Sequence, residues 1–330
     1  MGEIKMNILI TGITGFVASH LAEFLLNNNI KNLNLYGTKR WRSPMDNIKS
    51  IKDKINFVDM ELTDFLSVKS AIEESKPDII FHLAAQSFVP AGALQPRTTI
   101  TINTIGTLNI LEAVRLLKIN PVIHLASTGD VYGAVNKERI LLDEDVLPKP
   151  PNLYAVSKLS AELLAIQYHD TYNLKTVVSR ILTHTGPRRG AAFVESDFAK
   201  QIAEIELGLR KPIISVGNLN SIRTFLDVRD AVEAYWDLVN KCDYGEVYNI
   251  CGEETMTIKE MLDKLISLST MKDKIEVNID KKRFRPNDSF RPGLKMGKFI
   301  KATSWKPKTP FDITLKDLLD YWREMVKDGE

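Results

Sequence analysis

Short apolar runs alternate with longer stretches of helical spacing through the first half of the chain. Met6–Thr11 is typical of a buried strand, and Gly15–Asn28 carries apolar residues at helical spacing. Nearly all-apolar strands that alternate with helices indicate a parallel sheet covered on both faces. The pattern therefore predicts an α/β fold with a doubly wound, Rossmann-like sheet. Its further strands are expected at Leu33–Tyr36, Ile55–Val58, Ile79–Leu83, Val122–Ala126 and Thr176–Ser179, with helices near Asp64–Ser75, Thr104–Lys118 and Tyr154–Tyr172.

The rhythm changes after about Arg180. A helix at Val232–Lys241 and a strand at Val247–Ile250 look like a late return to the sheet. We therefore expect residues 1–182 to form the cofactor domain, with 225–252 rejoining it, and 183–330 to form a smaller, interleaved substrate lobe. Other elements expected in this half are the loop His184–Gly190, helices Phe193–Gly208, Ile258–Ser269 and Ile313–Val326, and strands Ile213–Val216 and Ile275–Asn278.

A glycine-containing turn joins the first strand to the first helix. Gly12 permits a tight turn, and Gly15 lets backbone N–H groups approach a phosphate. The start of the helix, at Phe16 and Val17, adds the partial positive charge of a helix N-terminus. Glycines also occur in purely structural turns, but the position between strand and helix favours a dinucleotide site.

The end of the second strand bears on which dinucleotide binds. An acidic residue there would favour a free ribose 2′-hydroxyl, but this chain has Thr38, Lys39 and Arg40 instead. A hydroxyl and two cations could bind a 2′-phosphate through charge-assisted hydrogen bonds. The alternative is a solvated basic loop. The sequence favours NADP, with NAD as the second choice.

Two further segments carry candidate catalytic groups. Thr128 and Asp130 follow the strand Val122–Ala126, at the sheet edge where such folds bind ligands. Tyr154 and Lys158 are spaced to lie on one helical face. A nearby ammonium lowers the pKa of a phenol from its usual value near 10, which suits proton transfer at a carbon that exchanges hydride with nicotinamide.

Composition excludes several other classes of function. The net charge is +2, from 44 basic and 42 acidic residues, and this balance favours neither nucleic acid nor a membrane surface as partner. Two cysteines cannot build a disulfide framework, and no window approaches 18 uninterrupted apolar residues. We therefore expect a cytoplasmic protein. No Cys/His or carboxylate cluster has metal-ligand spacing, so no metal site is expected.

With these motifs, the chain resembles the extended short-chain dehydrogenases/reductases that act on nucleotide sugars. It is most similar to the branch of GDP-mannose 4,6-dehydratase and GDP-4-keto-6-deoxymannose reductase. The resemblance runs nearly end to end. Besides the motifs above, it rests on Leu83–Ser87, Asn103–Asn109, His184–Gly190, Val216–Leu219, Arg223, Asp227–Asp230, Arg285-Pro286 and Leu318–Arg323.

The resemblance implies roles at matching positions. Tyr154 would be the catalytic phenol, Lys158 its partner and a ribose ligand, Thr128 a hydroxyl on the sugar, and Asp130 a base. The cofactor site would comprise Gly12, Thr14, Gly15, Phe16, Val17, Thr38, Arg40, Glu61, Leu62, Leu83, Ala84, Ala85 and Gln86, together with Tyr154 and Lys158. The nucleotide-sugar site would comprise Ser87, Thr128, Thr183, Arg188, Val194, Lys200, Arg223, Arg285 and Asp288, with both Arg223 and Arg285 on the diphosphate.

The chain departs from this branch at several positions. The dehydratases that it resembles have a glutamate base where this chain has Asp130, whose side chain is roughly 1.5 Å shorter. Thr183 and Thr224 replace a usual asparagine and aspartate. A 4,6-dehydratase acting on a GDP-sugar such as GDP-mannose is favoured. A GDP-4-keto-6-deoxy-sugar reductase, a C4 epimerase or dehydrogenase, and a non-enzymatic NADP-binding sensor or scaffold remain alternatives.

The resemblance also implies self-association. The helices near Thr104–Lys118 and Tyr154–Tyr172 would form a four-helix interface in a homodimer. The loop Arg40–Ser43 would extend this to a homotetramer.

Overall fold

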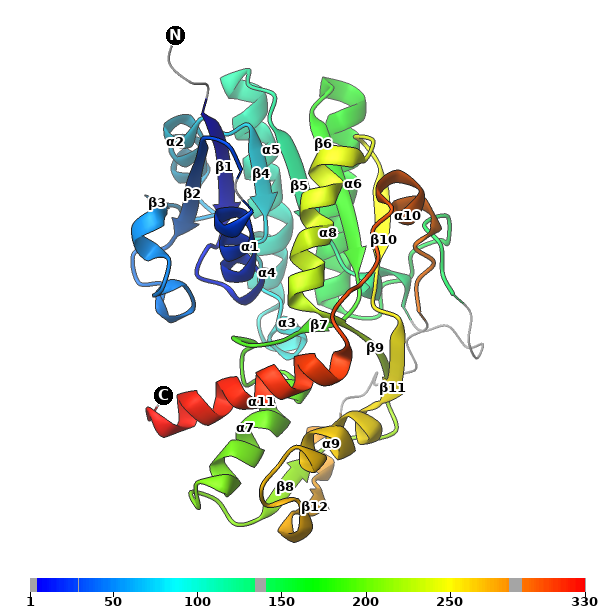
Figure 1. Cartoon of the computed structure of the whole chain (residues 1–330). Coiled ribbons are helices and arrows are strands. Elements are labelled where there is room, and N and C mark those ends of the chain that lie inside the picture. The colour runs from blue at the N-terminus through cyan, green and yellow to red at the C-terminus, as the bar shows by residue number, and fades with distance from the viewer. Residues whose placement is uncertain (1–4, 29, 134–140, 285–292, 330) are drawn as a thin grey trace.

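The computed structural model describes residues 5–28, 30–133, 141–284 and 293–329. A parallel-sheet unit forms the upper part of the molecule in Figure 1, and a smaller lobe built mostly from the second half of the chain lies below it.

The sheet unit contains seven parallel strands in the order β3-β2-β1-β4-β5-β6-β10. The order reverses between β1 and β4, so the carboxyl ends of these two strands face the crevice where doubly wound folds bind ligands. The prediction of a Rossmann-like sheet is confirmed. The strands are β1 (Met6–Thr11), β2 (Leu33–Lys39), β3 (Asn56–Asp59), β4 (Ile79–His82), β5 (Val122–Ala126), β6 (Lys175–Ile181) and β10 (Val247–Ile250).

Helices cover both faces of this sheet, as its apolar strands require. One face packs against α1 and α8, and the other against α2, α5 and α6. Each face has its own buried cluster, the first including Leu21 and Leu238 and the second Ile72 and Ile110. The covering helices are α1 (Phe16–Asn27), α2 (Phe65–Ser75), α5 (Gly106–Leu117), α6 (Leu153–Tyr172) and α8 (Val228–Lys241).

The chain returns to the sheet unit twice after Leu182. The first return is α8 followed by β10, as the sequence indicated. The second is α10 (Gly297–Thr303), which contacts α8 and β10 and contributes Phe299 to the first cluster, together with Trp305 just beyond it. The division drawn from the sequence did not include this second return.

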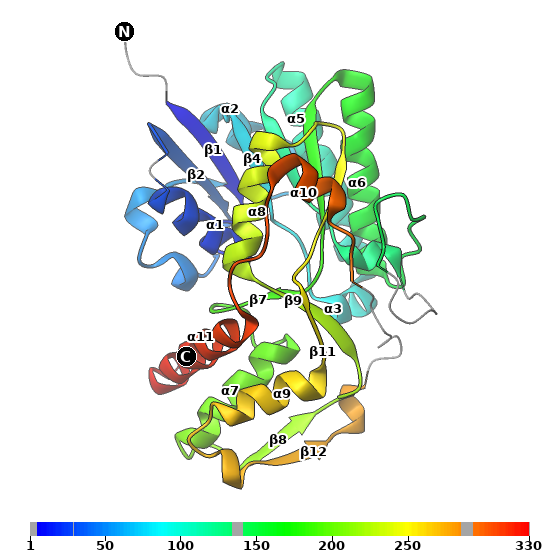
Figure 2. The same cartoon turned by 45° about the vertical axis from the view of Figure 1, so that its right-hand side comes forward.

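The lower lobe packs three helices over a small sheet, as Figure 2 shows. Phe198, Leu262 and Leu315 are fully buried between the helices. A separate three-stranded sheet, β11-β9-β7, connects the lobe with the upper unit. The elements are α7 (Val194–Glu206), α9 (Ile258–Ser267), α11 (Phe311–Lys327), β8 (Ile213–Val216) paired with β12 (Glu276–Ile279), and β7 (His184–Thr185), β9 (Ile222–Asp227) and β11 (Glu254–Thr257).

A continuous helical run, Pro96–Leu117, precedes β5. It comprises α4 (Pro96–Ile100), a π-helical turn (Thr101–Ile105) and α5. By length and composition alone these 22 residues could cross a membrane. In this fold the run packs against α2 and α6. Shorter helical elements are α3 (Val89–Leu94) and the turns η1 (Asp46–Ile48), η2 (Lys52–Lys54), η4 (Gly129–Tyr132), η5 (Lys272–Lys274) and η6 (Lys281–Arg283).

Candidate active site

A cavity of about 930 Å³ lies at the carboxyl ends of the strands, between the sheet unit and the lower lobe. It brings together all of the residues expected to bind the cofactor or to act in catalysis, Thr128 among them, and four further residues expected to bind substrate. These are Gly12, Thr14, Gly15, Phe16, Val17, Thr38, Arg40, Glu61, Leu62, Leu83, Ala84, Ala85, Gln86, Thr128, Asp130, Tyr154 and Lys158, with Ser87, Thr183, Val194 and Arg223.

The turn between β1 and α1 forms a cradle that only glycine permits. Gly12 has a φ of +67°, and a Cβ there would lie 3.1 Å from Ala84. The N–H of Gly15 donates to the Gly12 carbonyl at 2.9 Å, and no side chain caps the first turn of α1. An uncapped helix N-terminus at the edge of a cavity fits a phosphate group. The residues present therefore fit the pyrophosphate of a dinucleotide.

The three polar residues at the end of β2 have different contacts, which the sequence did not show. Thr38 is buried, and its hydroxyl accepts from the Gly12 N–H at 3.1 Å, so it braces the cradle. Lys39 forms an ion pair with Asp59 at 2.9 Å. Arg40 lines the cavity and forms no ion pair within the described part of the chain. Arg40 is therefore the cation best placed to meet a 2′-phosphate.

The segment after β4 is held in place by Asn103, which the sequence analysis did not single out. Asn103 lies in the π-helical turn, and its side chain accepts from the Gln86 N–H at 2.8 Å and donates to the Gln86 carbonyl at 3.0 Å. It also donates to the hydroxyl of Ser157 on α6. A π turn re-aims one side chain of a helix. Here it ties the end of β4 to the helix that carries Tyr154.

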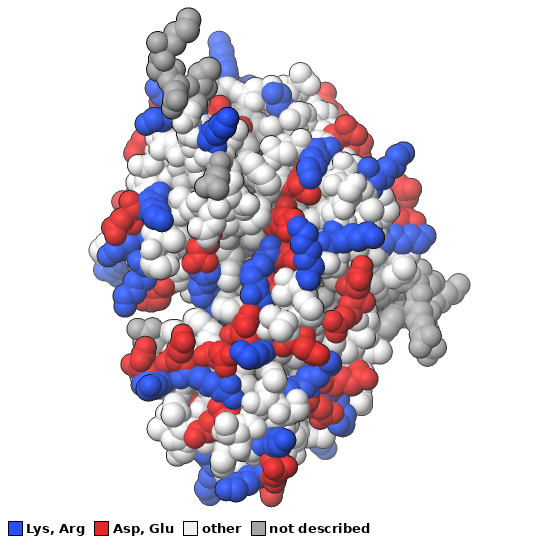
Figure 3. All heavy atoms as spheres, in the orientation of Figure 1, with Lys and Arg blue, Asp and Glu red and all other residues white. Residues whose placement is uncertain are grey.

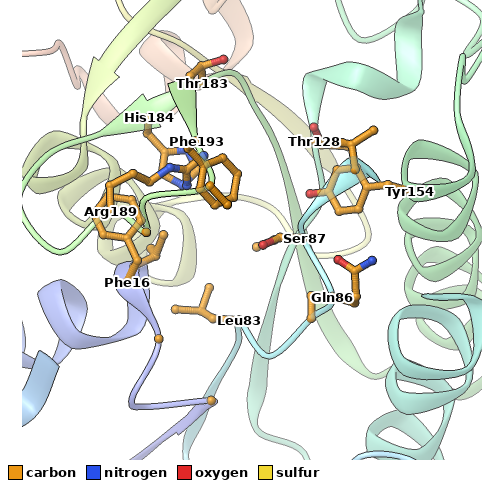
Figure 4. A pocket seen from close by; sticks show the side chains of 18 of the residues that line it. Phe16, Leu83, Gln86, Ser87, Thr128, Tyr154, Thr183, His184, Arg189 and Phe193 are labelled. Atoms are coloured by element: carbon orange, nitrogen blue, oxygen red, sulfur yellow. The ribbon is translucent and has the colours of Figure 1, made fainter. Parts of the chain in front are cut away.

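Thr128 and Asp130 lie on η4, directly after β5. The Thr128 hydroxyl accepts from the Asp130 N–H at 3.2 Å. A Cβ on Gly129 would lie 2.5 Å from the side chain of Leu182, so only glycine lets this turn pack so closely against β6 and its extension. Asn152 caps α6 by accepting from the Ala155 N–H at 2.9 Å, which fixes the first turn carrying Tyr154. In Figure 4 the Thr128 and Tyr154 side chains lie beside each other.

Lys158 lies one turn after Tyr154 and is buried with 6% of its surface exposed. Burial disfavours the charged amine and lowers the pKa of Lys158 to about 8. We call these groups, with the cradle and the segment after β4, the sheet wall of the cavity: Gly12–Val17, Ala84–Gln86, Thr128, Asp130, Tyr154 and Lys158.

The opposite wall comes from the segment after β6, and Figure 4 shows its rings and guanidinium facing Tyr154 across the cavity. The guanidinium of Arg189 lies 3.5 Å from the ring centroid of Phe193 and 5.2 Å from that of Phe16. Its Nε approaches Oε1 of Glu195 to 3.5 Å, yet neither atom has a hydrogen-bond partner among the described residues. We call His184, Arg189, Phe193 and Glu195 the loop wall.

The loop wall holds a poorly solvated positive charge. Burial lowers the pKa of Arg189, with Glu195 acting in the opposite direction. His184 donates its Nδ1–H to the Leu182 carbonyl at 3.1 Å and stacks on Phe16. Burial and the Arg189 charge lower the pKa of His184 to about 4, so this imidazole is neutral at pH 7. The wall therefore offers one guanidinium and one neutral ring to an anionic ligand.

Two described residues that were expected to bind substrate, Arg188 and Lys200, do not line the cavity. Arg188 has a φ of +71°, which turns it away from its neighbour Arg189 and toward Glu23 on α1. Lys200 lies over the ring of Trp322 in the core of the lower lobe, with its Nζ 5.1 Å from the centroid. Neither residue lines the cavity. Arg285 and Asp288 lie outside the described residues.

The far end of the cavity is polar, where the lower lobe closes it. Arg223 on β9 and Arg283 on η6 both line this end, with Asn218 and Asp197. Arg283 forms an ion pair with Asp197 at 2.6 Å. Arg189 and Arg283 were missed because a cation in a loop or a basic run has no distinctive pattern. Their positions follow from the fold.

Comparison with known proteins places this geometry in context. The family model described as GDP-mannose 4,6 dehydratase matches residues 9–318. The GDP-6-deoxy-D-mannose reductase of Pseudomonas aeruginosa is 34% identical over 76% of this chain and 82% of its own. Human GDP-mannose 4,6 dehydratase is 30% identical over 99% of this chain and 94% of its own. The solved structure of RMD from Pseudomonas aeruginosa in complex with NADPH superposes with a TM-score of 0.82 at 30% identity, covering 97% of this chain and 100% of that one.

Proposed function

The chain belongs to the GDP-mannose 4,6 dehydratase family, and we propose that it is a 4,6-dehydratase acting on a GDP-sugar such as GDP-mannose. Membership makes it an extended short-chain dehydrogenase/reductase enzyme that uses a nicotinamide cofactor, NADP in preference to NAD, and a nucleotide-sugar substrate. The observation that carries the dehydratase proposal is that a carboxylate, Asp130, lies on the same wall as Thr128 and Tyr154.

The proposed reaction converts a hexose into its 4-keto-6-deoxy derivative and one water. Bound NADP supplies a reversible acceptor for the hydride that leaves C4 and returns to C6, so the cofactor shows no net change. The phenolate of Tyr154 takes the proton of the C4 hydroxyl, and Thr128 hydrogen-bonds the same region of the sugar. Asp130 removes the proton from C5, which the C4 carbonyl has acidified, and passes it to the C6 hydroxyl, which departs as water. C5 regains a proton as C6 is reduced, and Tyr154 gives up the one it took, so the atoms balance.

Lys158 and the cradle hold the reacting groups in position. The cradle at Gly12–Val17 would receive the pyrophosphate, Arg40 the 2′-phosphate and Lys158 the nicotinamide ribose. Because Lys158 is buried beside Tyr154, its ammonium would stabilise the phenolate while the proton moves. Arg189 would complete the site from the loop wall.

Next to Asp130, whose side chain is one methylene shorter than that of a glutamate, the turn packs closely against Leu182. Gly129 packs so closely on Leu182 that a Cβ would come within 2.5 Å of that side chain. A side chain at position 129 would require Leu182 to shift, so glycine lets the turn pack directly on Leu182. We propose that this close packing compensates for the missing methylene of Asp130, so that its carboxylate still reaches C5.

A 4-keto-6-deoxy-sugar reductase is the second candidate. The reductase from Pseudomonas aeruginosa, at 34% identity, is the observation that favours it. In that reaction Tyr154 would donate a proton to the C4 oxygen while hydride arrives at C4. Asp130 would have no proton to remove from C5, so a variant at this position separates the two candidates.

The diphosphate of the substrate is assigned to the far end of the cavity. Arg223 and Arg283 supply two cations there, and the predicted Arg285 follows two residues later in sequence. Two guanidinium groups suit a diphosphate because each can bind oxygen atoms in a bidentate manner. The preference for guanine rests on family membership.

The first test is to incubate the purified protein with GDP-mannose, without added cofactor and then with NADP⁺, and to follow the mass of the nucleotide sugar. Loss of one water with no net reduction of NADP⁺ supports the dehydratase. Unchanged GDP-mannose, combined with NADPH-dependent reduction of the 4-keto-6-deoxy sugar, would replace it with the reductase. Turnover of neither, with NADPH still bound, would point to another sugar.

We further propose a homodimer that forms through α5 and α6. These neighbouring helices expose large apolar side chains to solvent in the single chain, among them Leu116, Val156 and Leu163, with Leu163 56% exposed. Leu163→Glu should convert the protein to a monomer in size-exclusion chromatography with light scattering. Leu209→Glu, on a leucine of the lower lobe that is 69% exposed, is the matched control and should leave the oligomer intact. A tetramer through the exposed Trp41 would add to this dimer.

The cysteines accord with a cytoplasmic enzyme. Cys242 and Cys251 are both free and buried. Burial raises the pKa of the Cys242 thiol to about 12 and that of Cys251 to about 11, so neither is a reactive thiolate at pH 7. Free thiols are the normal state in a reducing compartment.

A further inference from the structure

Arg188 was expected to bind substrate, but four hydrogen bonds of 3.0 Å or less hold its guanidinium behind the loop wall, and its Nε also lies 3.3 Å from Nε2 of His20. Its Nη1 donates to Oε1 of Glu23 at 3.0 Å and to the Asn47 carbonyl at 2.9 Å. Its Nη2 donates to Oε2 of Glu23 at 2.6 Å and to Nδ1 of His20 at 2.7 Å. The Arg188 side chain is 13% exposed, so this bidentate pair is largely shielded from solvent.

The neutral state of His20 is consistent with this arrangement. Its Nε2 lies 2.9 Å from the Pro187 carbonyl and must donate to it, which leaves Nδ1 as the acceptor for Arg188. Burial and the Arg188 charge lower the pKa of His20 to about 4. At pH 7 the imidazole therefore accepts from Arg188 and donates to the loop. Both bonds join α1 to the segment before Arg189.

The hydrogen bonds around Arg188 also extend to the cradle. The side-chain amide of Asn47 donates to the Thr14 carbonyl at 2.9 Å, so Arg188 is one residue removed from the turn between β1 and α1. The ring of His20 packs edge-on against Phe16, which lines the cavity and lies under Arg189. One guanidinium thus contacts α1 and η1, and it is linked through His20 to the Pro187 carbonyl before the loop wall and through Asn47 to the cradle.

We propose that Arg188 is a positioning residue which, with Glu23, fixes the loop wall against the cradle and so sets the affinity of the enzyme for its dinucleotide cofactor. The two consecutive arginines have different roles, since Arg188 pairs with Glu23 and Arg189 lines the cavity. The positive φ of Arg188 directs its side chain away from that of Arg189. Without the ion pair, the segment carrying Arg189 would keep the hydrogen bond between His20 and Pro187 but lose its charge-assisted attachment to α1. Cofactor binding would then have to order this segment, and because this ordering opposes binding, the affinity for the cofactor would fall.

The test measures NADPH binding by fluorescence titration without any sugar, so it is independent of which sugar reaction the enzyme performs. Arg188→Met and Glu23→Gln should each raise the Kd for NADPH about tenfold, because each breaks charge-assisted hydrogen bonds. The double variant should be no weaker than the worse single variant, since both remove one interaction. Arg188→Lys, which keeps the charge but loses the fork, should lie between.

Arg323→Met is the matched control. Arg323 makes an equally bidentate pair with Glu206, at 2.7 and 2.9 Å, and neither residue lines the cavity. This variant should lower the Tm while leaving the Kd for NADPH within about twofold. The proposal is overturned if Arg188→Met binds NADPH like the unmodified protein, or if Arg323→Met weakens binding as much. Failure of the unmodified protein to bind NADPH would overturn the cofactor assignment itself.

Discussion

The sheet wall and the loop wall enclose the same cavity, but their polar groups are satisfied in different ways. On the sheet wall, Thr38 holds Gly12, and Asn103 holds Gln86 through two hydrogen bonds. On the loop wall, Arg189 and Glu195 are buried, and the facing atoms of this pair lack hydrogen-bond partners among the described residues. These polar groups of the sheet wall therefore already have hydrogen-bond partners. The loop wall, in contrast, has a donor on Arg189 and an acceptor on Glu195 that are still unused among the described residues.

This difference indicates which part of the site is preorganised. Groups that must be aligned for chemistry lie on parallel strands and a capped helix, whose positions are fixed by the core. A buried cation with an unused hydrogen-bond donor destabilises the folded protein unless an anion accepts a hydrogen bond from it. We therefore expect the loop wall to reach its final form only with the cofactor bound. Charge elsewhere is mixed, as Figure 3 shows for one face of the molecule, so the recognition of anions is local.

The largest expected effect follows from removing the phenol on the sheet wall. Tyr154→Phe should reduce turnover by about 10³–10⁴-fold, because no other group would take the C4 proton. The Kd for NADPH should change by less than about threefold, since the wall itself is unaltered. Initial rates and fluorescence titration measure the two quantities. Tyr172→Phe, at the other end of the same helix, is the control, and turnover by Tyr154→Phe at a tenth of the normal rate would contradict the assignment.

A smaller but more discriminating effect is expected at Asp130. Asp130→Asn should slow water loss by about 10²–10³-fold while leaving proton transfer at C4 intact. A single turnover with GDP-mannose should then accumulate reduced cofactor, visible by its absorbance, because the sequence stops after C4 oxidation. If the protein is a reductase instead, Asp130→Asn should leave the reduction of the 4-keto sugar nearly unchanged.

Removal of the buried pair of charges from the loop wall should raise the stability of the protein but weaken its binding of NADPH. Arg189→Met together with Glu195→Met replaces a buried pair of charges with apolar side chains, so the cofactor-free protein should gain about 1–2 kcal/mol in its free energy of unfolding. The same variant should raise the Kd for NADPH by about 10–100-fold, because the anion loses its partner. Urea unfolding and titration measure the two effects. A loss of stability together with unchanged binding would show that this wall is complete without ligand.

The sheet wall was largely predictable from the sequence because its residues are tied to regular elements. Strands such as Met6–Thr11 and Val122–Ala126 were predicted at their observed bounds, and the end of each strand fixes where Gly12 and Thr128 lie. Tyr154 and Lys158 follow from helical spacing. These positions depend on local pattern and on the rule that parallel strands share a carboxyl edge.

The loop wall was predictable only in part because its geometry depends on tertiary contacts. Arg188 and Arg189 are identical in type and adjacent, and nothing local says which one faces the cavity. The positive φ of Arg188 decides it, and that conformation is held by Glu23 and His20, more than 160 residues earlier. The short strands β7, β9 and β11 were likewise missed, since β9 carries polar residues such as Thr224 and Asp227 in a buried setting.

Lys158 is the exception within the sheet wall, and it gives the smallest of the expected effects. Its pKa of about 8 lies below the ordinary 10.5 because burial disfavours the ammonium. Below pH 8 both the folded and the unfolded chain carry the proton, so the folded state bears the full cost of a buried charge. Lys158→Met should therefore stabilise the cofactor-free protein by about 1–2 kcal/mol at pH 7.

This stabilisation should shrink as the pH rises. Between pH 8 and 10.5 the folded protein gives up the Lys158 proton while the unfolded chain keeps it, so the stability of the unmodified protein rises relative to the variant. Urea unfolding of both proteins at pH 7 and pH 9.5 measures the difference. A gap between them that stays constant with pH would mean that the ammonium is well solvated. The sheet wall would then have no unsatisfied charge, and the contrast with Arg189 would be sharper than the structure indicates.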